Sequence, residues 1–198
     1  MIYLMRHGQT VWNVQSRLQG RRDSPLTATG VAQAEAFGRR LADLVSDPAA
    51  CRVIASPLGR AWQTAVLAVA HMGGDPGRIE LDDRLMEHAF GAWEGLTWAD
   101  VNRDHAASLA ARMADRWNVP APGGESYSDV AARVSAWLAD VAGAVDAARP
   151  ALAICHGVTA RVVRGLYAGL SREETMRLPE PQDRIFKLAD GRIEEIEV

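Results

Sequence analysis

Short apolar segments alternate with long amphipathic segments along this chain of 198 residues. The apolar segments are rich in Ile, Val and Leu, are bounded by Gly, Pro, Asp or Ser, and occupy residues 2–5, 52–55, 78–81 and 151–155. Runs of this length and composition are typical of strands buried on both faces of a parallel sheet. The alternation therefore predicts an α/β fold, a three-layer αβα sandwich in which a mainly parallel central sheet carries helices on both faces.

The amphipathic segments predict the helices of this sandwich. Apolar side chains recur in them at three- and four-residue steps, which gives each helix one apolar stripe, over residues 27–45, 58–71 and 127–148. Thr27 is a suitable N-cap for the first helix, and Ser126 or Ser128 for the third. Pro150 ends the third helix because a proline cannot continue one.

Two regions depart from this alternation. Residues 88–124 contain three tryptophans, several charged residues and the turn sequence PAPGG, which together predict a small helical cap inserted into the fold. Residues 185–188 and 192–198 flank Asp190-Gly191, a pair typical of a tight hairpin turn. The length of the chain favours a single domain over residues 1–198 that includes this cap.

Two of the predicted strands end in the same dipeptide, His-Gly. The sequences are HGQT at residues 7–10 and HGVT at residues 156–159. In open α/β sheets, ligands bind beyond the carboxyl ends of the strands, where the strand order reverses. We therefore expect His7 and His156 to face one crevice, with Gly8 allowing the backbone to turn sharply after the first strand.

Two arginines are expected to lie near these histidines. Arg6 directly precedes His7, and Arg60 lies early in the helix that follows the strand at residues 52–55. Guanidinium groups in such positions can hold an anion, and phosphoryl transfer requires positive charge around the phosphoryl oxygens. The sequence has no GxxxxGK[ST] loop, no HExxH motif and no GxGxxG after the first strand, which argues against a P-loop nucleoside triphosphatase, a zincin and a dinucleotide-binding domain. A phosphoryl site without a metal or other cofactor is the expectation.

The charge and cysteine content exclude several other classes of function. The formal net charge of −3 and the lack of long basic runs argue against attraction to nucleic acid or an anionic membrane surface. The apolar run before Arg6 is too short for a signal peptide or a membrane span, so a cytoplasmic protein is expected. Cys51 and Cys155 lie in apolar runs, where buried free thiols are more common than disulfides.

Six segments resemble, in order, the histidine phosphatase superfamily with its phosphoglycerate mutase-like fold. They are LMRHGQTVWN (residues 4–13), SPLTATGVAQA (24–34), ASPLGRAWQTA (55–65), LMEHAFGAWEG (85–95), PGGES (122–126) and CHGVTAR (155–161), so the resemblance spans nearly the whole chain. It implies that His7 is the nucleophile that becomes a phosphohistidine. It also implies that Arg6, Arg60 and His156 surround the phosphoryl group.

The same resemblance implies roles for Asn13 and Glu87. Asn13 would bond the phosphoryl group, and Glu87 would protonate the leaving oxygen and then activate water. A histidine nucleophile must be neutral at the attacking nitrogen, with its other ring nitrogen held by an acceptor. Glu87 must carry a proton when the leaving group departs, which calls for partial burial or a nearby phosphate. An activity optimum on the acid side is therefore expected.

The remaining candidates each leave two interpretations open. Gly8, Thr10 and Arg21 complete the predicted substrate-binding residues, together with Asn13. Thr10 either caps a helix or donates to the phosphate, and Arg21 either holds an anionic part of the substrate or lies in a solvated loop. His88 adjoins the predicted acid and is expected either to pack or to reach the rim of the pocket.

The sequence thus predicts a metal-independent phosphomonoesterase that acts on a small phosphorylated metabolite, as a monomer or a homodimer. The FGAWEG motif and the short chain resemble the phosphatase branch of the superfamily, with a bisphosphate-dependent phosphoglycerate mutase as the alternative. A non-catalytic phospholigand-binding module is disfavoured because the nucleophile, arginine and acid positions are all filled. One departure is Cys155, which stands where a small residue such as serine is common in relatives.

Overall fold

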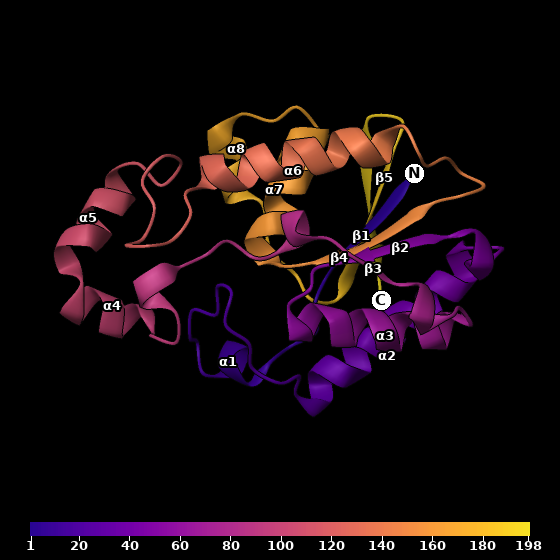
Figure 1. Ribbon diagram of the computed structural model, residues 1–198, viewed down its shortest axis with the longest axis horizontal. Helices are drawn as coiled ribbons and strands as arrows, with labels where there is room; N and C mark the ends of the chain where they lie inside the picture. The colour runs from indigo at the N-terminus through magenta and orange to yellow at the C-terminus, as the bar shows by residue number, and fades with distance from the viewer.

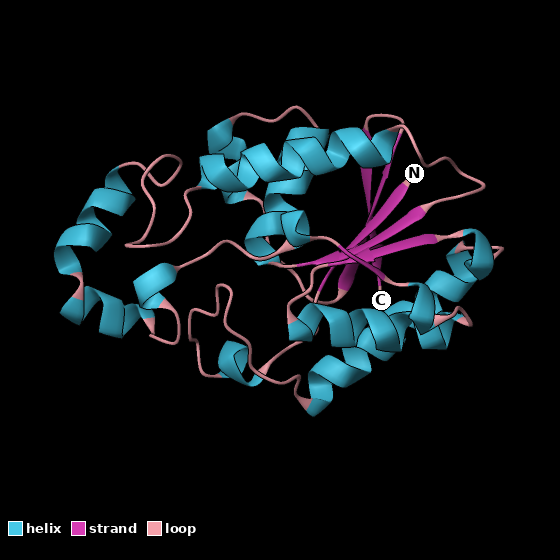
Figure 2. Ribbon diagram, viewed as in Figure 1, coloured by secondary structure: helices cyan, strands magenta, loops and turns pink.

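The structure is a computed structural model that describes residues 1–198, apart from the side chain of residue 142. Its strands are β1 (Ile2–Arg6), β2 (Arg52–Ala55), β3 (Glu80–Leu81), β4 (Ala151–Cys155), β5 (Arg184–Ala189) and β6 (Arg192–Glu197). They form one six-stranded sheet, whose strands are magenta in Figure 2. The strand order is β3-β2-β4-β1-β5-β6. The first four of these are mutually parallel, whereas β5 runs antiparallel to β1 and β6 antiparallel to β5. The predicted α/β fold with a mainly parallel sheet is confirmed.

Helices cover both faces of this sheet, as Figure 1 shows. The α-helices are α1 (Val11–Val14), α2 (Ala28–Leu44), α3 (Gly59–Met72), α4 (Trp98–Asp104), α5 (Ala106–Ala114), α6 (Tyr127–Ala142), α7 (Gly157–Tyr167) and α8 (Arg172–Arg177). Short 3-10 turns are η1 (Pro48–Ala50), η2 (Pro76–Arg78), η3 (Asp83–Leu85) and η4 (Gly91–Trp93). α2 and α3 lie on one face, α6 and α7 on the other, which gives the three expected layers.

The alternation of side chains along β1 separates the two apolar cores. Ile2 and Leu4 are buried in the core that contains the apolar stripe of α6, whereas Tyr3 and Met5 are buried in the core shared with α2 and α3. Successive residues of a strand point to opposite faces, so one central strand serves both layers. This arrangement fixes β1 in the middle of the sandwich, with its carboxyl end beside that of β4.

Most predicted ends of elements match the structure, and two do not. Thr27 is the N-cap of α2 and Ser126 the N-cap of α6, each accepting a backbone N–H with its hydroxyl. α6 ends at residue 142, six residues earlier than predicted, with Gly143 as its C-cap; further on, the Asp146 carboxylate accepts the N–H groups of residues 148 and 149 in a turn. β3 begins at Glu80 rather than at residue 78, because η2 occupies the start of the predicted strand.

α4 and α5 lie apart from the sheet, beyond the carboxyl ends of its parallel strands (Figure 1). They belong to the stretch between β3 and α6, and a separate small apolar cluster joins Trp93, Val101 and Ala121 of this stretch to Leu18, which lies between α1 and α2. Trp93 is fully buried, so it packs rather than contacting solvent. Among the described helices, none combines the length and the apolar character needed to cross a membrane.

Candidate active site

The two His-Gly motifs meet at the centre of the sheet. Arg6 at the end of β1 pairs in register with Cys155 at the end of β4, and the N–H of His7 donates to the Cys155 carbonyl at 3.0 Å. The rings of His7 and His156 therefore lie side by side, with centroids 5.1 Å apart and an interplanar angle of 58°. The chain leaves β1 toward the face of α2 and leaves β4 toward the face of α7, so this is the point at which ligands bind in sheets of this kind.

His7 has the tautomer that a nucleophile requires. Its Nδ1 lies 2.8 Å from the carbonyl oxygen of Gly8, which can only accept, so Nδ1 carries the proton and donates it. The other nitrogen, Nε2, accepts the Nε–H of Arg60 at 3.2 Å. Burial, followed by the charges of Arg60 and Arg6, holds the pKa of His7 well below its usual range. The ring is therefore neutral at neutral pH, with a lone pair on Nε2.

Arg60 is fixed by oxygen atoms that surround its guanidinium. Nη1 donates to the Arg22 carbonyl at 2.8 Å and to Asp23 Oδ1 at 2.7 Å, and Nη2 donates to the Gly20 carbonyl at 2.7 Å. The other carboxylate oxygen of Asp23 accepts the N–H of Gly59 at 2.7 Å, at the start of α3. Asp23 thus caps the helix and orients the arginine that the helix carries. Sequence reasoning missed this acid because its partner lies in another segment of the chain.

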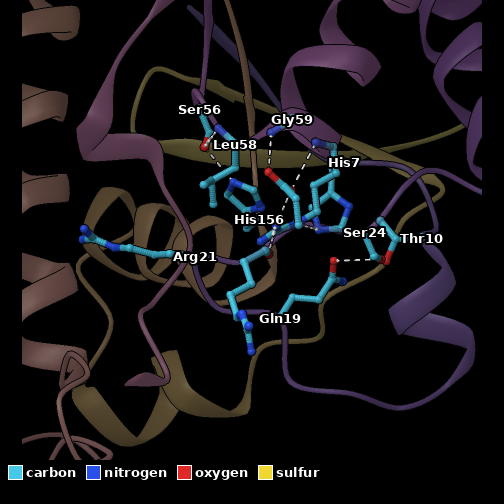
Figure 3. Close-up of polar contacts among 12 residues, drawn as sticks. His7, Thr10, Gln19, Arg21, Ser24, Ser56, Leu58, Gly59 and His156 are labelled. Carbon is cyan, nitrogen blue, oxygen red and sulfur yellow. Dashed lines mark hydrogen bonds and ion pairs between the residues drawn. The ribbon is translucent and has the colours of Figure 1, made fainter. Parts of the chain in front are cut away.

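His156 is held from one side only. Its Nε2 lies 2.7 Å from the hydroxyl oxygen of Ser56, which follows β2 (Figure 3). Among the residues that the structure describes, none bonds its buried Nδ1 or the buried Nε of Arg6. Burial, followed by Arg60 and then His7, lowers the pKa of His156 well below its usual range. Arg6 ends β1 and His156 follows β4, the strand paired with it, so both nitrogens are candidate donors to an anion bound at this end of the sheet.

Asn13 is oriented by three donors that converge on its amide oxygen. The N–H and the hydroxyl of Thr10 donate to Oδ1 at 3.0 and 3.1 Å, and Nε2 of Gln182 donates to it at 3.2 Å. Gln182 also donates to the His7 carbonyl at 3.0 Å. Because Oδ1 already accepts these hydrogen bonds, the Nδ2 amino group of Asn13 is the part of the amide that can donate to a ligand in the cleft, which Asn13 lines. Gln182 is a second residue that the sequence did not reveal.

The Glu87 carboxylate lies against the first turn of α7, where it accepts hydrogen bonds from several backbone N–H groups. Its Oε1 accepts the N–H of His88 at 3.0 Å and the N–H of Thr159 at 3.3 Å, while Oε2 accepts the N–H of Val158 at 3.4 Å. The side chain is buried but lines the same cleft as His7. The helix N-terminus and its backbone donors fix the position of this carboxyl group.

The cleft has a volume of about 290 Å³ and is strongly cationic, although the whole chain carries a net charge of −3. Its arginines outnumber its carboxylates; they are Arg6, Arg17, Arg60, Arg112, Arg116 and Arg161, against Glu87 and Glu180. Local positive charge of this kind attracts and holds anionic ligands. In the described part of the chain, no three His, Cys, Asp or Glu side chains are grouped so that they could hold a metal ion.

The structure does not bring three of the predicted substrate-binding residues into this cleft. Arg21 is exposed, donates to a carboxylate oxygen of Glu125 at 3.1 Å, and extends away from the two histidines (Figure 3). Thr10 is buried as the N-cap of α1. Gly8 packs against Gly30, whose carbonyl oxygen would lie 2.3 Å from a Cβ at this position, so no larger residue fits there.

His88 does not reach the rim of the pocket. Its ring is fully buried, edge-on to Phe90 with centroids 4.7 Å apart, and its Nε2 lies 3.2 Å from Nη2 of Arg112. Sequence reasoning also missed Arg112 and Arg116, because the spacing of charges within residues 88–124 does not tell which of them line the cleft. Arg17 lines the cleft, whereas Arg21, which the sequence favoured in the same loop, does not.

Comparison with known proteins agrees with this geometry. Residues 2–189 match the family described as "Histidine phosphatase superfamily (branch 1)". The chain is 34% identical over 177 residues to "Probable phosphoglycerate mutase GpmB" of Enterobacter sp. (strain 638), a match that covers 89% of this chain and 79% of the relative. It is 38% identical over 184 residues to the glucosyl-3-phosphoglycerate phosphatase of Mycobacterium tuberculosis (strain ATCC 25618 / H37Rv), covering 86% of this chain and 73% of that protein.

Solved structures of this family have the same fold as this chain. The mycobacterial glucosyl-3-phosphoglycerate phosphatase complexed with VO3 superposes with a TM-score of 0.79 at 29% identity, over 99% of this chain and 96% of that one. The α-ribazole phosphatase of Shigella flexneri has the same fold, with a TM-score of 0.81 at 22% identity over 100% of this chain and 95% of that one. The chain, with its paired histidines at the centre of the sheet, belongs to the histidine phosphatase superfamily.

Proposed function

We propose that this protein hydrolyses small phosphomonoesters through a phosphohistidine on His7, without a metal ion. The observation that carries the proposal is the neutral His7 ring, which keeps a lone pair on Nε2 between Arg60 and Arg6 in the cleft that Glu87 also lines. Nε2 attacks phosphorus as the ester P–O bond breaks, and Glu87 gives its proton to the leaving oxygen. Glu87 then takes a proton from water, the resulting hydroxide attacks phosphorus, the N–P bond breaks, and inorganic phosphate leaves.

The other residues of the centre stabilise the transferring phosphoryl group in this proposal. Arg60 turns its Nε–H from His7 to a phosphoryl oxygen, and Arg6 Nε and His156 Nδ1, which bond no other described residue, donate to further phosphoryl oxygens. Asn13 adds its amino group. Guanidinium groups neutralise the charge of the equatorial oxygens without exchanging protons, which lowers the barrier.

Labelling tests the covalent step. Acid-quenched protein incubated with a phosphorylated substrate is expected to carry label on His7, while His7→Ala protein, folded by circular dichroism, carries none. A panel of natural phosphomonoesters, assayed with and without a chelator, is expected to release phosphate equally in both conditions. If the folded wild-type protein neither carries label nor releases phosphate, the proposal is contradicted and a phospholigand-binding module is favoured.

The role of Glu87 as an acid has a separate test. Glu87→Gln is expected to lower kcat/KM by about 10²- to 10⁴-fold on an alkyl phosphate, because the alkoxide leaving group needs a proton. The loss on 4-nitrophenyl phosphate should be much smaller, since nitrophenolate leaves without one. Equal losses on the two substrates, or a rate profile of the wild type that is flat from acid to strongly alkaline pH, would remove this role from Glu87.

Mutase activity is the second candidate, because a relative 34% identical to this chain is named as a phosphoglycerate mutase. In a mutase the phosphohistidine returns its phosphoryl group to a substrate oxygen rather than to water. A coupled assay of phosphoglycerate interconversion, with and without 2,3-bisphosphoglycerate, separates the two. We expect phosphate release to exceed interconversion; bisphosphate-dependent interconversion faster than phosphate release would reverse this choice.

We further propose that residues 88–124 act as the cap of a single domain spanning residues 1–198, and that this cap selects the substrate. α4 and α5 lie over the carboxyl ends of the parallel strands, and Phe90, Trp98 and Arg112 line the cleft from this side.

We also propose a cytoplasmic location for this protein. Cys51 and Cys155 are buried and free, which is in keeping with a reducing compartment.

A further inference from the structure

We propose that Glu180 and Arg161 are positioning residues, whose ion pair holds Arg6 in the orientation that phosphoryl binding requires. Glu180 belongs to the segment of residues 178–183, which connects α8 to β5. This inference rests on the proposed phosphatase function and adds two residues that act on the centre without contacting the phosphoryl group. It starts from one observation: the backbone carbonyl of Glu180 accepts a hydrogen bond from Nη1 of Arg6.

The orientation of Arg6 depends on this contact. In the described part of the chain, the Glu180 carbonyl is the one oxygen that accepts from its guanidinium, and its buried Nε bonds none of the described residues. A guanidinium presents its donors in one plane and in fixed directions. The position of the Glu180 carbonyl therefore decides where the remaining donors of Arg6 point.

The backbone around Glu180 is stiff. Glu180 lies between Pro179 and Pro181, and the residue before a proline is restricted to extended conformations. Each proline also fixes its own φ. Residues 179–181 therefore have few alternative conformations, and contacts that fix their position also fix the Glu180 carbonyl.

Arg161 of α7 supplies such contacts. Its Nη2 pairs with Oε1 of Glu180 at 2.9 Å, and its Nε donates to the Leu178 carbonyl at 2.8 Å. Its Nη1 donates to the hydroxyl oxygen of Tyr127 at 2.8 Å, so each of its three nitrogens has a protein oxygen as partner. Arg161 lines the cleft, but its donors are directed at the protein. We therefore assign it to holding the 178–183 segment rather than to binding a ligand.

The glycine of the second His-Gly motif is explained by the same arrangement. Gly157 is the first residue of α7, where a helical backbone does not require glycine. A Cβ at this position would lie 2.5 Å from Oε2 of Glu180 and 3.4 Å from Cζ of Arg6. The glycine thus leaves room for the Glu180 carboxylate beside the Arg6 guanidinium.

Binding of orthovanadate tests the positioning role, because vanadate can adopt the five-coordinate geometry of a phosphoryl group in transfer. Calorimetry is the readout, since a partly unfolded preparation lowers the stoichiometry of binding but not the Kd. Glu180→Gln is expected to raise the Kd by at least about fivefold and to lower kcat/KM for 4-nitrophenyl phosphate in parallel. Arg164 also donates to the Pro179 carbonyl, so the 178–183 segment keeps an anchor in this variant.

The sign of the change in Kd distinguishes positioning from simple electrostatics. Glu180 lines the cleft, and a carboxylate there repels an anion, so loss of its charge alone would tighten binding of orthovanadate. Weaker binding therefore requires that Glu180 acts through a group that binds the anion. Glu194→Gln is the matched control, because it removes the same charge from an exposed pair with Lys187 at 3.1 Å, and it should leave the Kd unchanged.

Double-mutant cycles identify the group through which the pair acts. In an Arg6→Gln protein, Glu180→Gln should change the Kd by less than about threefold, because no guanidinium is left to orient. Arg161→Gln should weaken binding as Glu180→Gln does. Adding Glu180→Gln to Arg161→Gln should also change the Kd by less than about threefold, since either change breaks the same ion pair.

Two results would overturn the inference. One is a Kd of Glu180→Gln that is lower than in the wild type or raised by less than about fivefold; the other is an effect larger than about threefold in the Arg6→Gln protein. Failure of the proposed function is distinguishable, because binding needs no turnover. If the wild type binds orthovanadate but hydrolyses no phosphomonoester, the proposed function fails and the cycles still decide the positioning role. If the folded wild type does not bind orthovanadate, both fail.

Discussion

The centre of the sheet and the cap hold their functional side chains in different ways. At the centre, His7 and His156 are placed by strand register, and Arg60 by a helix whose first turn is capped from a neighbouring loop. In the cap, Arg112 is placed by side-chain contacts around a small apolar cluster that is separate from the two main cores. The side chains that we assign to catalysis are therefore positioned by the sheet and the helix that follows β2, whereas those that we assign to substrate selection are positioned by packing outside the two main cores.

Low pH should lower the stability of both regions, and this is the largest effect that we expect. His7 and His156 at the centre and His88 in the cap are buried neutral, with pKa values below those in the unfolded chain, and that of His88 is lowered to about 4. The unfolded chain binds protons first, so stability is complete above about pH 6.5 and falls as the pH drops below it. Each histidine contributes up to about 1.4 kcal/mol per pH unit, measured as the free energy of unfolding in urea between pH 7 and pH 5.

His88→Gln distinguishes the contribution of the cap to the pH dependence of the free energy of unfolding from the contribution of the centre. Glutamine can still accept from Arg112 but does not titrate, so the slope of stability against pH should decrease by about 1.4 kcal/mol per pH unit. The exposed His71 is the control, and His71→Gln should leave the slope as it is. A wild-type stability that does not change between pH 7 and pH 5 would show that these rings are not buried neutral.

At the centre, Asp23→Ala should reduce kcat/KM by about 100-fold. The change leaves the buried Arg60 guanidinium without its carboxylate and the first turn of α3 without its cap, at a cost of about 2 kcal/mol in stability. Asp43→Ala is the control, because Asp43 pairs with Arg40 on the surface at 3.6 Å and such pairs contribute little. Activity of Asp23→Ala within about threefold of the wild type would mean that Arg60 holds its position without this acid.

Gln182 joins the centre to the C-terminal part of the chain, and its loss should have a smaller effect. Gln182→Ala removes the donor to the His7 carbonyl and one of the three donors to Asn13 Oδ1, so His7 and Asn13 are positioned less precisely, and kcat should fall by about 10-fold with little change in KM. The exposed neighbour Asp183 provides the control, as Asp183→Ala. A change in KM alone would place Gln182 in substrate binding rather than in positioning the centre.

The same contrast explains what the sequence could predict. His7, His156 and Arg60 follow strands or begin a helix, and the order of strands in such sheets brings those points together, so local patterns located them. Asp23 and Gln182 act on partners that are 37 and 169 or more residues away along the chain, and no local pattern reveals such a pairing.

Among the arginines outside the two His-Gly motifs, the sequence favoured Arg21, in the loop between α1 and α2, as a candidate to hold an anionic part of the substrate. Arg21 follows the first motif closely, but its guanidinium pairs with Glu125, 104 residues further along, and lies outside the cleft. Arg112 carries no motif, and its place in the cleft depends on how α5 packs beside His88. The distance of an arginine from a motif along the sequence therefore did not predict whether it lines the cleft, because that depends on how the helices pack.

Cys155→Ser should have the smallest effect, and it tests whether proximity to the centre implies a chemical role. The thiol directly precedes His156 and is fully buried, and burial raises its pKa to about 12, so it remains protonated and unreactive. Its Sγ lies 3.8 Å from the His156 carbonyl, to which a serine hydroxyl could also donate. We expect kcat/KM within about twofold of the wild type and a loss of about 1 kcal/mol in stability, because a hydroxyl replaces an apolar group in the core. A loss of 10-fold or more in kcat at unchanged stability would instead show that the centre depends on sulfur beside His156, and that a position which we assign to packing belongs to the catalytic machinery.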